Sequence, residues 1–172
     1  MIHTPTKPLS KKPSRTVVVR RKSSRSGVKK SGVVSYHVRG PTGKIAAADF
    51  TPSKLVAVLR EGLPVQELND LQATLKVPME KLVPMLGISK ATLHRRKAQG
   101  RLDQAESDRV VRFARLMGKA VEVLESEQIA RQWLTSTQFG LGGAVPLEYA
   151  ETEVGAHEVE DLLGRIEYGV YS

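Results

Sequence analysis

Residues Met79 to Arg101 read MEKLVPMLGISKATLHRRKAQGR, and this stretch decides the fold. Apolar residues at helical spacing predict a short first helix, and Gly87 supplies the left-handed residue of the turn after it. Ser89 is a favourable N-cap for a second helix, which Gly100 ends. A short helix, a glycine turn and a second helix in this order are typical of a helix-turn-helix motif, whose second helix enters the major groove of DNA.

The second helix carries the side chains that DNA binding needs. Ala91 and Leu93 are the small and apolar residues available for packing, so the charged residues project outward. Arg and Lys pair with guanine edges or hold phosphates, and Thr contacts a thymine methyl group. A solvated cationic surface on an ordinary helical bundle is the competing interpretation, and the helix–glycine–serine–helix order favours DNA. The outward residues are Lys90, Thr92, Arg95, Arg96 and Lys97.

From Thr51 onward the apolar spacing is helical, and the predicted fold class is all-α. Asp103 and Glu106 form a capping-box pair that opens a long helix. Other helices are expected to begin near Pro52, Val65, Pro78, Ser126, Pro146 and Ala156. Before Thr51 the pattern differs: Gly32 to His37 and Lys44 to Ala47 predict a short strand pair around a Gly40-Pro41 turn.

Charge divides the chain into unlike parts. Residues 1–50 hold 12 Lys/Arg against one acid, residues 76–119 have a net charge of +7, and residues 120–172 have a net charge of −8. Residues 1–30 also combine Pro, Ser, Lys and Arg with few large apolar side chains, which predicts disorder. The basic parts favour phosphate binding, and the acidic end would repel DNA, so it predicts a protein partner.

Composition argues against several classes of protein. The chain has no cysteine, no run of about 18 apolar residues and no apolar signal segment behind its basic start. We therefore expect a soluble cytoplasmic protein without a membrane span. Its four histidines are scattered, and Gly40 to Lys44 is too short for a phosphate loop. With no Ser/His/Asp set marked by its local context either, we expect no metal, no cofactor and no enzymatic activity.

Two longer stretches resemble a known family. LGISKATLHRRKAQGRLDQAESDRVVRFARLMGKAVEVL, residues 86–124, strongly resembles antitoxins of the Xre/MbcA/ParS type. So does the ending, in which Trp133-Leu134 precedes Gly142-Gly143-Ala144 and Pro146-Leu147, and LLGRIEYGVYS occupies residues 162–172. The resemblance covers roughly residues 60–172 and leaves out the basic arm.

The resemblance implies two activities. The helix-turn-helix domain of such antitoxins forms a homodimer and binds double-stranded operator DNA to repress its own operon. The C-terminal domain binds a cognate RES-domain toxin, which consumes NAD, and blocks its active site. A cationic NAD pocket would complement the acidic end of this chain.

By position, the resemblance also assigns residues and domains. It adds Ser89 to the predicted DNA-binding residues, which are otherwise the outward residues Lys90, Thr92, Arg95, Arg96 and Lys97. The toxin-binding residues would be Leu147, Tyr149, Ile166, Tyr168, Gly169, Val170, Tyr171 and Ser172. For Tyr149, Tyr168 and Tyr171, packing on the last helix is the alternative. The expected domains are a largely disordered basic arm (1–50), a helix-turn-helix DNA-binding and dimerisation domain (51–125) and a small helical toxin-binding domain (126–172).

Two other functions remain open at this point. One is a transcription or chromosome-partition regulator of the same fold family, without a toxin partner. The other is a small nucleic-acid-binding enzyme, which the missing catalytic residues disfavour.

Overall fold

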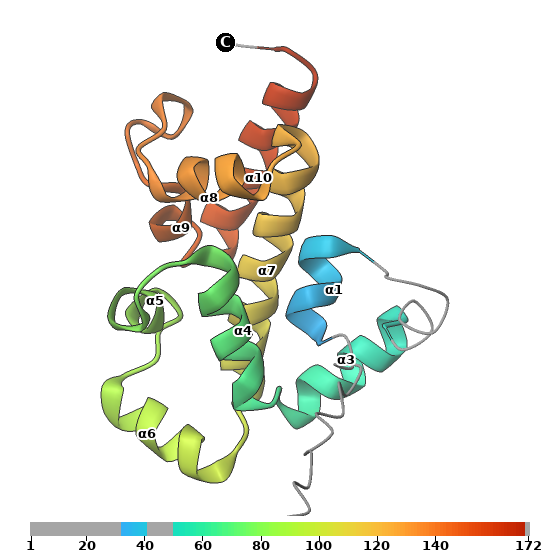
Figure 1. Cartoon of the computed structure of the whole chain (residues 1–172), viewed down its shortest axis with the longest axis vertical. Helices are drawn as coiled ribbons and strands as arrows, with labels where there is room; N and C mark the ends of the chain where they lie inside the picture. Colours follow the sequence, from blue (N-terminus) through green and yellow to red (C-terminus); the bar gives the residue numbers. More distant parts are fainter. Residues whose placement is uncertain (1–31, 41–49, 171–172) are drawn as a thin grey trace, which may run out of the picture.

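The computed structural model describes residues 32–40 and 50–170, and every regular element in these ranges is helical (Figure 1). This confirms the all-α prediction. The elements are α1 (Val33–Arg39), α3 (Pro52–Glu61), α4 (Val65–Leu75), α5 (Met79–Met85), α6 (Lys90–Gln99), α7 (Gln104–Leu124), α8 (Glu127–Thr135), the 3-10 turn η1 (Phe139–Leu141), α9 (Pro146–Tyr149) and α10 (Glu153–Glu167).

The long helix α7 is the centre of the fold. It runs along the long axis in Figure 1 and packs against α1, α3, α4, α8 and α10. Its predicted capping box is confirmed: the Asp103 side chain accepts the Glu106 N–H, and the Glu106 side chain accepts the Asp103 N–H, both at 2.8 Å. Phe113 and Met117 are completely buried on it. The helix therefore joins the α5–α6 end of the molecule to the α8–α10 end.

The predicted helix boundaries hold, with one shift. Gly62 ends α3 with φ +86°, and the Ser126 side chain caps α8 by accepting the Ile129 N–H. The last helix begins at Glu153 rather than near Ala156. Its start is earlier because the Thr152 hydroxyl accepts the Gly155 N–H at 3.0 Å, a cap that the apolar spacing does not reveal.

The predicted strand pair is wrong where the structure describes it, because residues 33–39 form α1. Val33, Val34 and Val38 are all buried, which one side of a helix allows, whereas the neighbours Val33 and Val34 would point to opposite faces of a strand. Residues 33–39, which were predicted to belong to a largely disordered arm (1–50), are therefore ordered. The expected strand at Lys44 to Ala47 and the expected disorder of residues 1–30 lie outside the described residues.

Candidate DNA-binding and partner-binding surfaces

Arg109 of α7 contacts the turn of the helix-turn-helix. Gly87 has φ +63° in the turn, and the guanidinium of Arg109 lies 3.0 Å from the position of a Cβ added there. Arg109 Nη1 also donates to the Leu86 carbonyl at 3.0 Å, so it satisfies a carbonyl at the end of α5. The Ser89 Oγ accepts the Thr92 N–H at 3.1 Å, which confirms the predicted N-cap. The turn between α5 and α6 thus has a defined geometry.

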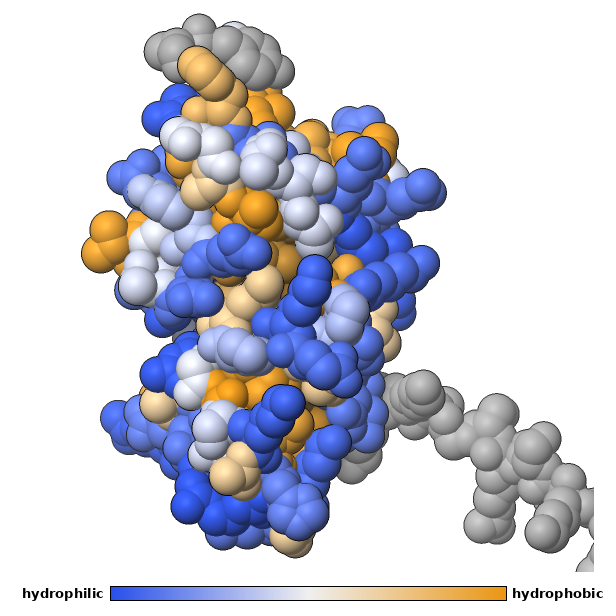
Figure 2. Space-filling model, turned by 90° about the vertical axis from the view of Figure 1, so that its left-hand side faces the viewer, coloured by the Kyte–Doolittle hydropathy of each residue, from blue (hydrophilic) through white to orange (hydrophobic). Residues whose placement is uncertain are grey.

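The helix α6 forms the lower end of the molecule in Figure 1, and none of its residues is fully buried. Lys90, Arg95 and Lys97 are exposed. None of the three has a carboxylate partner among the residues that the structure describes. Figure 2 shows mostly hydrophilic side chains over this lower end. The free cations of α6 are therefore available to phosphates and base edges.

Arg96 does not project outward, and that expectation is wrong. Its side chain is only 15% exposed, with Nε 2.8 Å from Glu106 Oε2 and Nη2 2.5 Å from Asp103 Oδ2. The hydrogen bond with Glu106 raises the pKa of Arg96. Arg96 is a clamp between α6 and the start of α7. Helical spacing missed this because the two acids follow a turn at Gly100.

The remaining predicted DNA-binding residues lie at the start of α6. Ser89 is exposed but already caps the helix, and its hydroxyl also lies 2.9 Å from Thr92 Oγ1. Thr92 is half-buried. Ala91, expected to pack inward, is exposed, and Leu93 alone contacts the core. The packing face of α6 is therefore narrower than predicted, and its exposed face is wider.

The predicted toxin-binding residues do not form one cluster. Leu147 is 1% exposed and belongs to the core. Tyr149 lies beside the first turn of α10, because a Cβ on Gly155 would be 1.8 Å from its carbonyl oxygen. Tyr168 and Val170 lie at the other end of α10, about 22 Å away for a 15-residue helix. Tyr171 and Ser172 are outside the described residues.

A groove beside the C-terminal end of α10 contains a residue that the sequence analysis missed. Phe139 in η1 is 99% exposed, and Tyr168 at the C-terminal end of α10 is 80% exposed. The groove has a volume of about 320 Å³. It is lined by Gln138, Phe139, Gly140, Leu162, Arg165, Ile166 and Val170. In the sequence, the only sign of Phe139 is that it is an aromatic residue directly before a glycine-rich loop. Large apolar side chains gathered on an exposed surface mark a binding site for a partner.

The loop that presents Phe139 is held by backbone contacts. Gln138 N–H donates to the Ala144 carbonyl at 3.0 Å, and the Gln138 side chain donates to the Trp133 carbonyl at 2.9 Å. Gly140 allows the loop to contact α10, since a Cβ there would lie 2.6 Å from a methyl carbon of Leu162. The backbone that carries Phe139 therefore has a defined position relative to α10.

Two family models together cover most of the chain. A model described as the antitoxin Xre-like helix-turn-helix domain matches residues 54–115. A model described as the antitoxin Xre/MbcA/ParS C-terminal toxin-binding domain matches residues 119–169. Antitoxin Xre of Yersinia enterocolitica is 35% identical over 120 residues, which are 69% of this chain and 81% of the relative.

The chain belongs to the Xre antitoxin family.

Two further relatives agree with this. Antitoxin Xre of Photorhabdus laumondii is also 35% identical over 120 residues, with the same coverage of 69% and 81%. A Sphingobium protein named Prs ADP-ribosylating antitoxin is 24% identical over 132 residues, which are 71% of this chain and 83% of the relative. The antitoxin therefore has a helix-turn-helix domain and a toxin-binding domain, as the resemblance implied.

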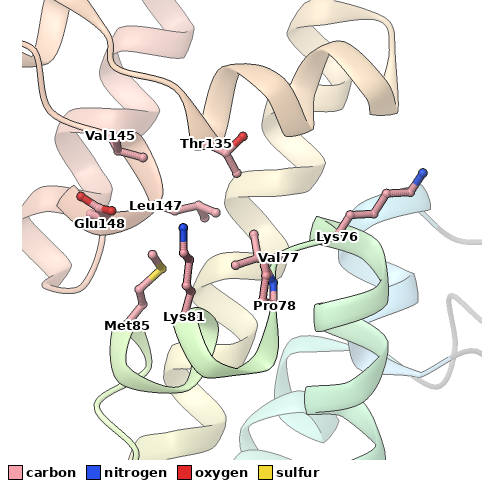
Figure 3. A pocket seen from close by; sticks show the side chains of 9 residues that line it. All are labelled: Lys76, Val77, Pro78, Lys81, Met85, Thr135, Val145, Leu147 and Glu148. Atoms are coloured by element: carbon pink, nitrogen blue, oxygen red, sulfur yellow. The ribbon is translucent and has the colours of Figure 1, made fainter.

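The two family domains of this antitoxin share α7. Their matches end at residue 115 and begin at residue 119, both within that helix. Arg131 of α8 donates to the Thr74 carbonyl of α4 at 2.6 Å, which also connects the two halves. Between them lies a hollow of about 230 Å³, into which Lys81 and Leu147 point from opposite sides (Figure 3). Leu147 thus packs between the domains.

Part of the acidic segment of the antitoxin is neutralised within the chain. Three acids of α10 pair with three cations of α7: Arg112 with Glu153 at 2.7 Å, Arg115 with Glu160 at 3.0 Å and Lys119 with Glu167 at 2.7 Å. The hydrogen bond to Glu167 raises the pKa of Lys119. This corrects the inference that the whole net charge of −8 faces a partner. The exposed acids without a cation partner among the described residues are Glu125, Glu148, Glu151, Glu158 and Asp161.

Within residues 32–40 and 50–170, no group of three or more His, Asp or Glu side chains is placed to hold a metal ion. None of the helices in the same ranges is long and apolar enough to cross a membrane.

Proposed function

We propose that this chain is the antitoxin of a RES-domain toxin that consumes NAD. It neutralises the toxin by covering its active site, and it binds operator DNA as a homodimer to repress its own operon in the cytoplasm. Its role is binding rather than catalysis. The observation that supports the proposal most strongly is the separation of two unlike surfaces: free cations on α6 at one end of α7 and an apolar groove at the other.

The cationic surface is suited to duplex DNA. Lys90 and Thr92 lie in the first turn of α6, where a helix in the major groove reaches base edges. Arg95 and Lys97 follow and can hold phosphates on either side. We assign operator contact to Ser89, Lys90, Thr92, Arg95 and Lys97. Arg96 is left out because its guanidinium is held by two carboxylates.

The apolar surface is suited to a protein partner. Phe139 and Tyr168 together expose two aromatic rings, and aromatic anchors supply much of the affinity in protein interfaces. Ile166 and Val170 line the same groove. Gly169, Tyr171 and Ser172, which adjoin Val170 in the sequence, are retained as proposed toxin contacts. Arg165 lines the same groove and offers a cation to a carboxylate of the partner. We therefore place the principal toxin contact at the Phe139 groove, and Tyr149 outside it.

The proposed chemistry of the toxin has support from one relative. The name of the Sphingobium protein pairs an antitoxin with ADP-ribosylation, a reaction in which NAD supplies the ADP-ribose group. A toxin of that kind must bind NAD, and its pocket is the natural target for an inhibitor that excludes the substrate.

The test is expression of the neighbouring reading frame with and without this chain. We expect a RES-domain protein that stops growth and lowers cellular NAD when it is expressed alone. Co-expression of the full chain should restore both growth and NAD. The matched control is the Lys90→Ala/Arg95→Ala variant, which should still protect, since neutralisation does not use α6. A neighbouring protein that leaves NAD unchanged, or a full chain that fails to protect, would contradict the proposal.

A further inference from the structure

The connection between α3 and α4 lies against the connection between α6 and α7. The Leu102 N–H donates to the Leu63 carbonyl at 2.8 Å. The Val65 N–H donates to the carbonyl of Gly100, which is the C-cap of α6, at 3.1 Å. These two backbone hydrogen bonds hold the last turn of α3 beside the C-terminal end of α6.

Gly62 allows the two connections to approach this closely. It has φ +86°, and a Cβ on it would lie 2.0 Å from the Leu102 carbonyl oxygen, so only glycine is suited to this position. The Arg101 Nε donates to the Gly62 carbonyl at 3.2 Å. From the core, the hydroxyl of Ser107 in α7 accepts the Leu63 N–H at 2.8 Å. The position of the end of α3 relative to α6 is therefore determined by contacts on both sides.

Three cations lie within a few residues of this junction, and each is exposed. Arg60 in the last turn of α3 has no carboxylate partner within the part of the chain that the structure describes. The same is true of Lys97 in the last turn of α6. The Arg101 side chain is 52% exposed and lies 3.5 Å from the carboxylate of Glu61, which is 68% exposed. Three cations and one acid give the junction a net charge of +2.

The junction lies where a phosphate backbone would pass a helix in the major groove. The helix α6 has ten residues and is about 15 Å long, whereas the major groove is about 12 Å wide. When the first turn of α6 reaches base edges, its C-terminal end therefore lies near the backbone that borders the groove. Figure 1 shows α6 and the lower end of α3 together at the lower end of the molecule. Cations at the junction can thus meet phosphates without competing for bases.

We propose that Arg60 and Arg101 form, beside Lys97, a second DNA contact that binds the phosphate backbone next to the end of α6. The ligand group is the phosphodiester of duplex DNA, which carries no sequence information of its own. The inference rests on the proposed binding of DNA by α6, and it adds α3, which is not one of the two helices of the helix-turn-helix. Glu61 opposes this contact, because its carboxylate repels phosphates and pairs with Arg101.

The test measures the affinity of the full chain for a labelled duplex of its own promoter over a range of salt concentrations, with a scrambled duplex of equal length beside it. Arg60→Ala should reduce the slope of log affinity against log salt by about 0.9, the amount for one phosphate contact. Both duplexes should be bound more weakly by the same factor, about fivefold, since a phosphate contact does not read sequence. Arg60→Lys should retain most of the affinity, because it keeps the cation.

Glu61→Gln should have an effect of opposite sign. It removes a carboxylate and releases Arg101, so both duplexes should be bound about threefold more tightly, within the range for an exposed charge pair. Arg39→Ala and Glu158→Gln are the matched controls, with the same charge changes elsewhere. Arg39 pairs with Glu127 of α8, and Glu158 is exposed on α10. Neither control should change DNA affinity, because physiological salt screens exposed charges beyond about 8 Å.

An unchanged affinity and salt slope in Arg60→Ala would overturn the proposal. Losses of equal size in Arg39→Ala would overturn it as well, because net charge alone would then explain them. A cation in the last turn also stabilises a helix, so the melting temperature of Arg60→Ala is measured beside the affinity. If both fall together, Arg60 supports the fold and does not contact DNA.

The proposed operator binding fails separately, if the unaltered chain does not distinguish the promoter from the scrambled duplex. In that case the effect of Arg60→Ala on both duplexes still tests the phosphate contact, since this contact is expected on any sequence.

Discussion

The two ends of α7 present surfaces of opposite chemistry. At the lower end, α6 exposes cations, and buried ion pairs such as Arg96 with Glu106 hold it from behind. At the upper end, η1 and α10 expose Phe139 and Tyr168, and backbone hydrogen bonds hold the loop. The difference indicates how each surface binds. A cationic surface binds by releasing counterions and is sensitive to salt, whereas an apolar one depends on a few buried anchors.

The largest expected effect is at the apolar end. Phe139→Asp should weaken toxin binding about 100-fold or more, since it places a charge where an aromatic anchor is expected to be buried. Affinity for the purified toxin, measured by calorimetry, is the readout. Val154→Asp is the matched control, because Val154 is 74% exposed on the first turn of α10, away from the groove. Equal losses for both variants would show that α10 as a whole, and not the groove, binds the toxin.

The cationic end should respond differently. Lys90→Ala/Arg95→Ala should weaken promoter binding about 30-fold and reduce the salt slope by about 2, because each cation releases counterions. Toxin affinity should stay unchanged. The measurement is a salt titration of DNA binding by anisotropy. If toxin affinity falls along with DNA affinity, the two surfaces are not independent, and the proposed separation of DNA binding from toxin binding is wrong.

The smallest effect is expected at Arg96, whose ion pairs with Asp103 and Glu106 hold α6 against the start of α7. Arg96→Ala should lower the melting temperature by a few degrees, because the carboxylate of Glu106, itself 4% exposed, loses its cation. Lys97→Ala, which removes an exposed cation from the same helix, should leave it unchanged. Arg96→Lys should restore the stability only in part, since one ammonium cannot contact Asp103 and Glu106 as a guanidinium does. If Arg96→Ala leaves the melting temperature unchanged but abolishes DNA binding, Arg96 contacts DNA after all.

Local patterns were sufficient where the interaction is local. The N-caps at Ser89 and Ser126, the capping box at Asp103 and the left-handed turn at Gly87 each depend on residues three or four positions apart. Such contacts can be predicted from the sequence because the same short segment contains both partners. The family resemblance extended the prediction to the C-terminal domain, since it covers stretches that no local pattern explains.

The site residues were predicted less well, for a physical reason. Outward and inward directions on a short helix depend on what packs beside it. Arg96 turns inward because two acids of α7 lie there, and Leu147 is buried because it packs between the two domains. Phe139 gave little sign in the sequence, because a single aromatic in a loop is as consistent with burial as with full exposure.

The sequence by itself determined the helices from Pro52 onward, the caps at Ser89, Asp103 and Ser126, and the presence of a helix-turn-helix with an Xre-type C-terminal domain. Only the tertiary structure decided which cations are free, that residues 33–39 form a docked helix, and where the apolar groove lies. Helix formation depends on neighbours within one or two turns. The placement of Glu67 against α1, or of Glu160 against α7, depends on residues more than 30 positions away, which only the folded chain brings together.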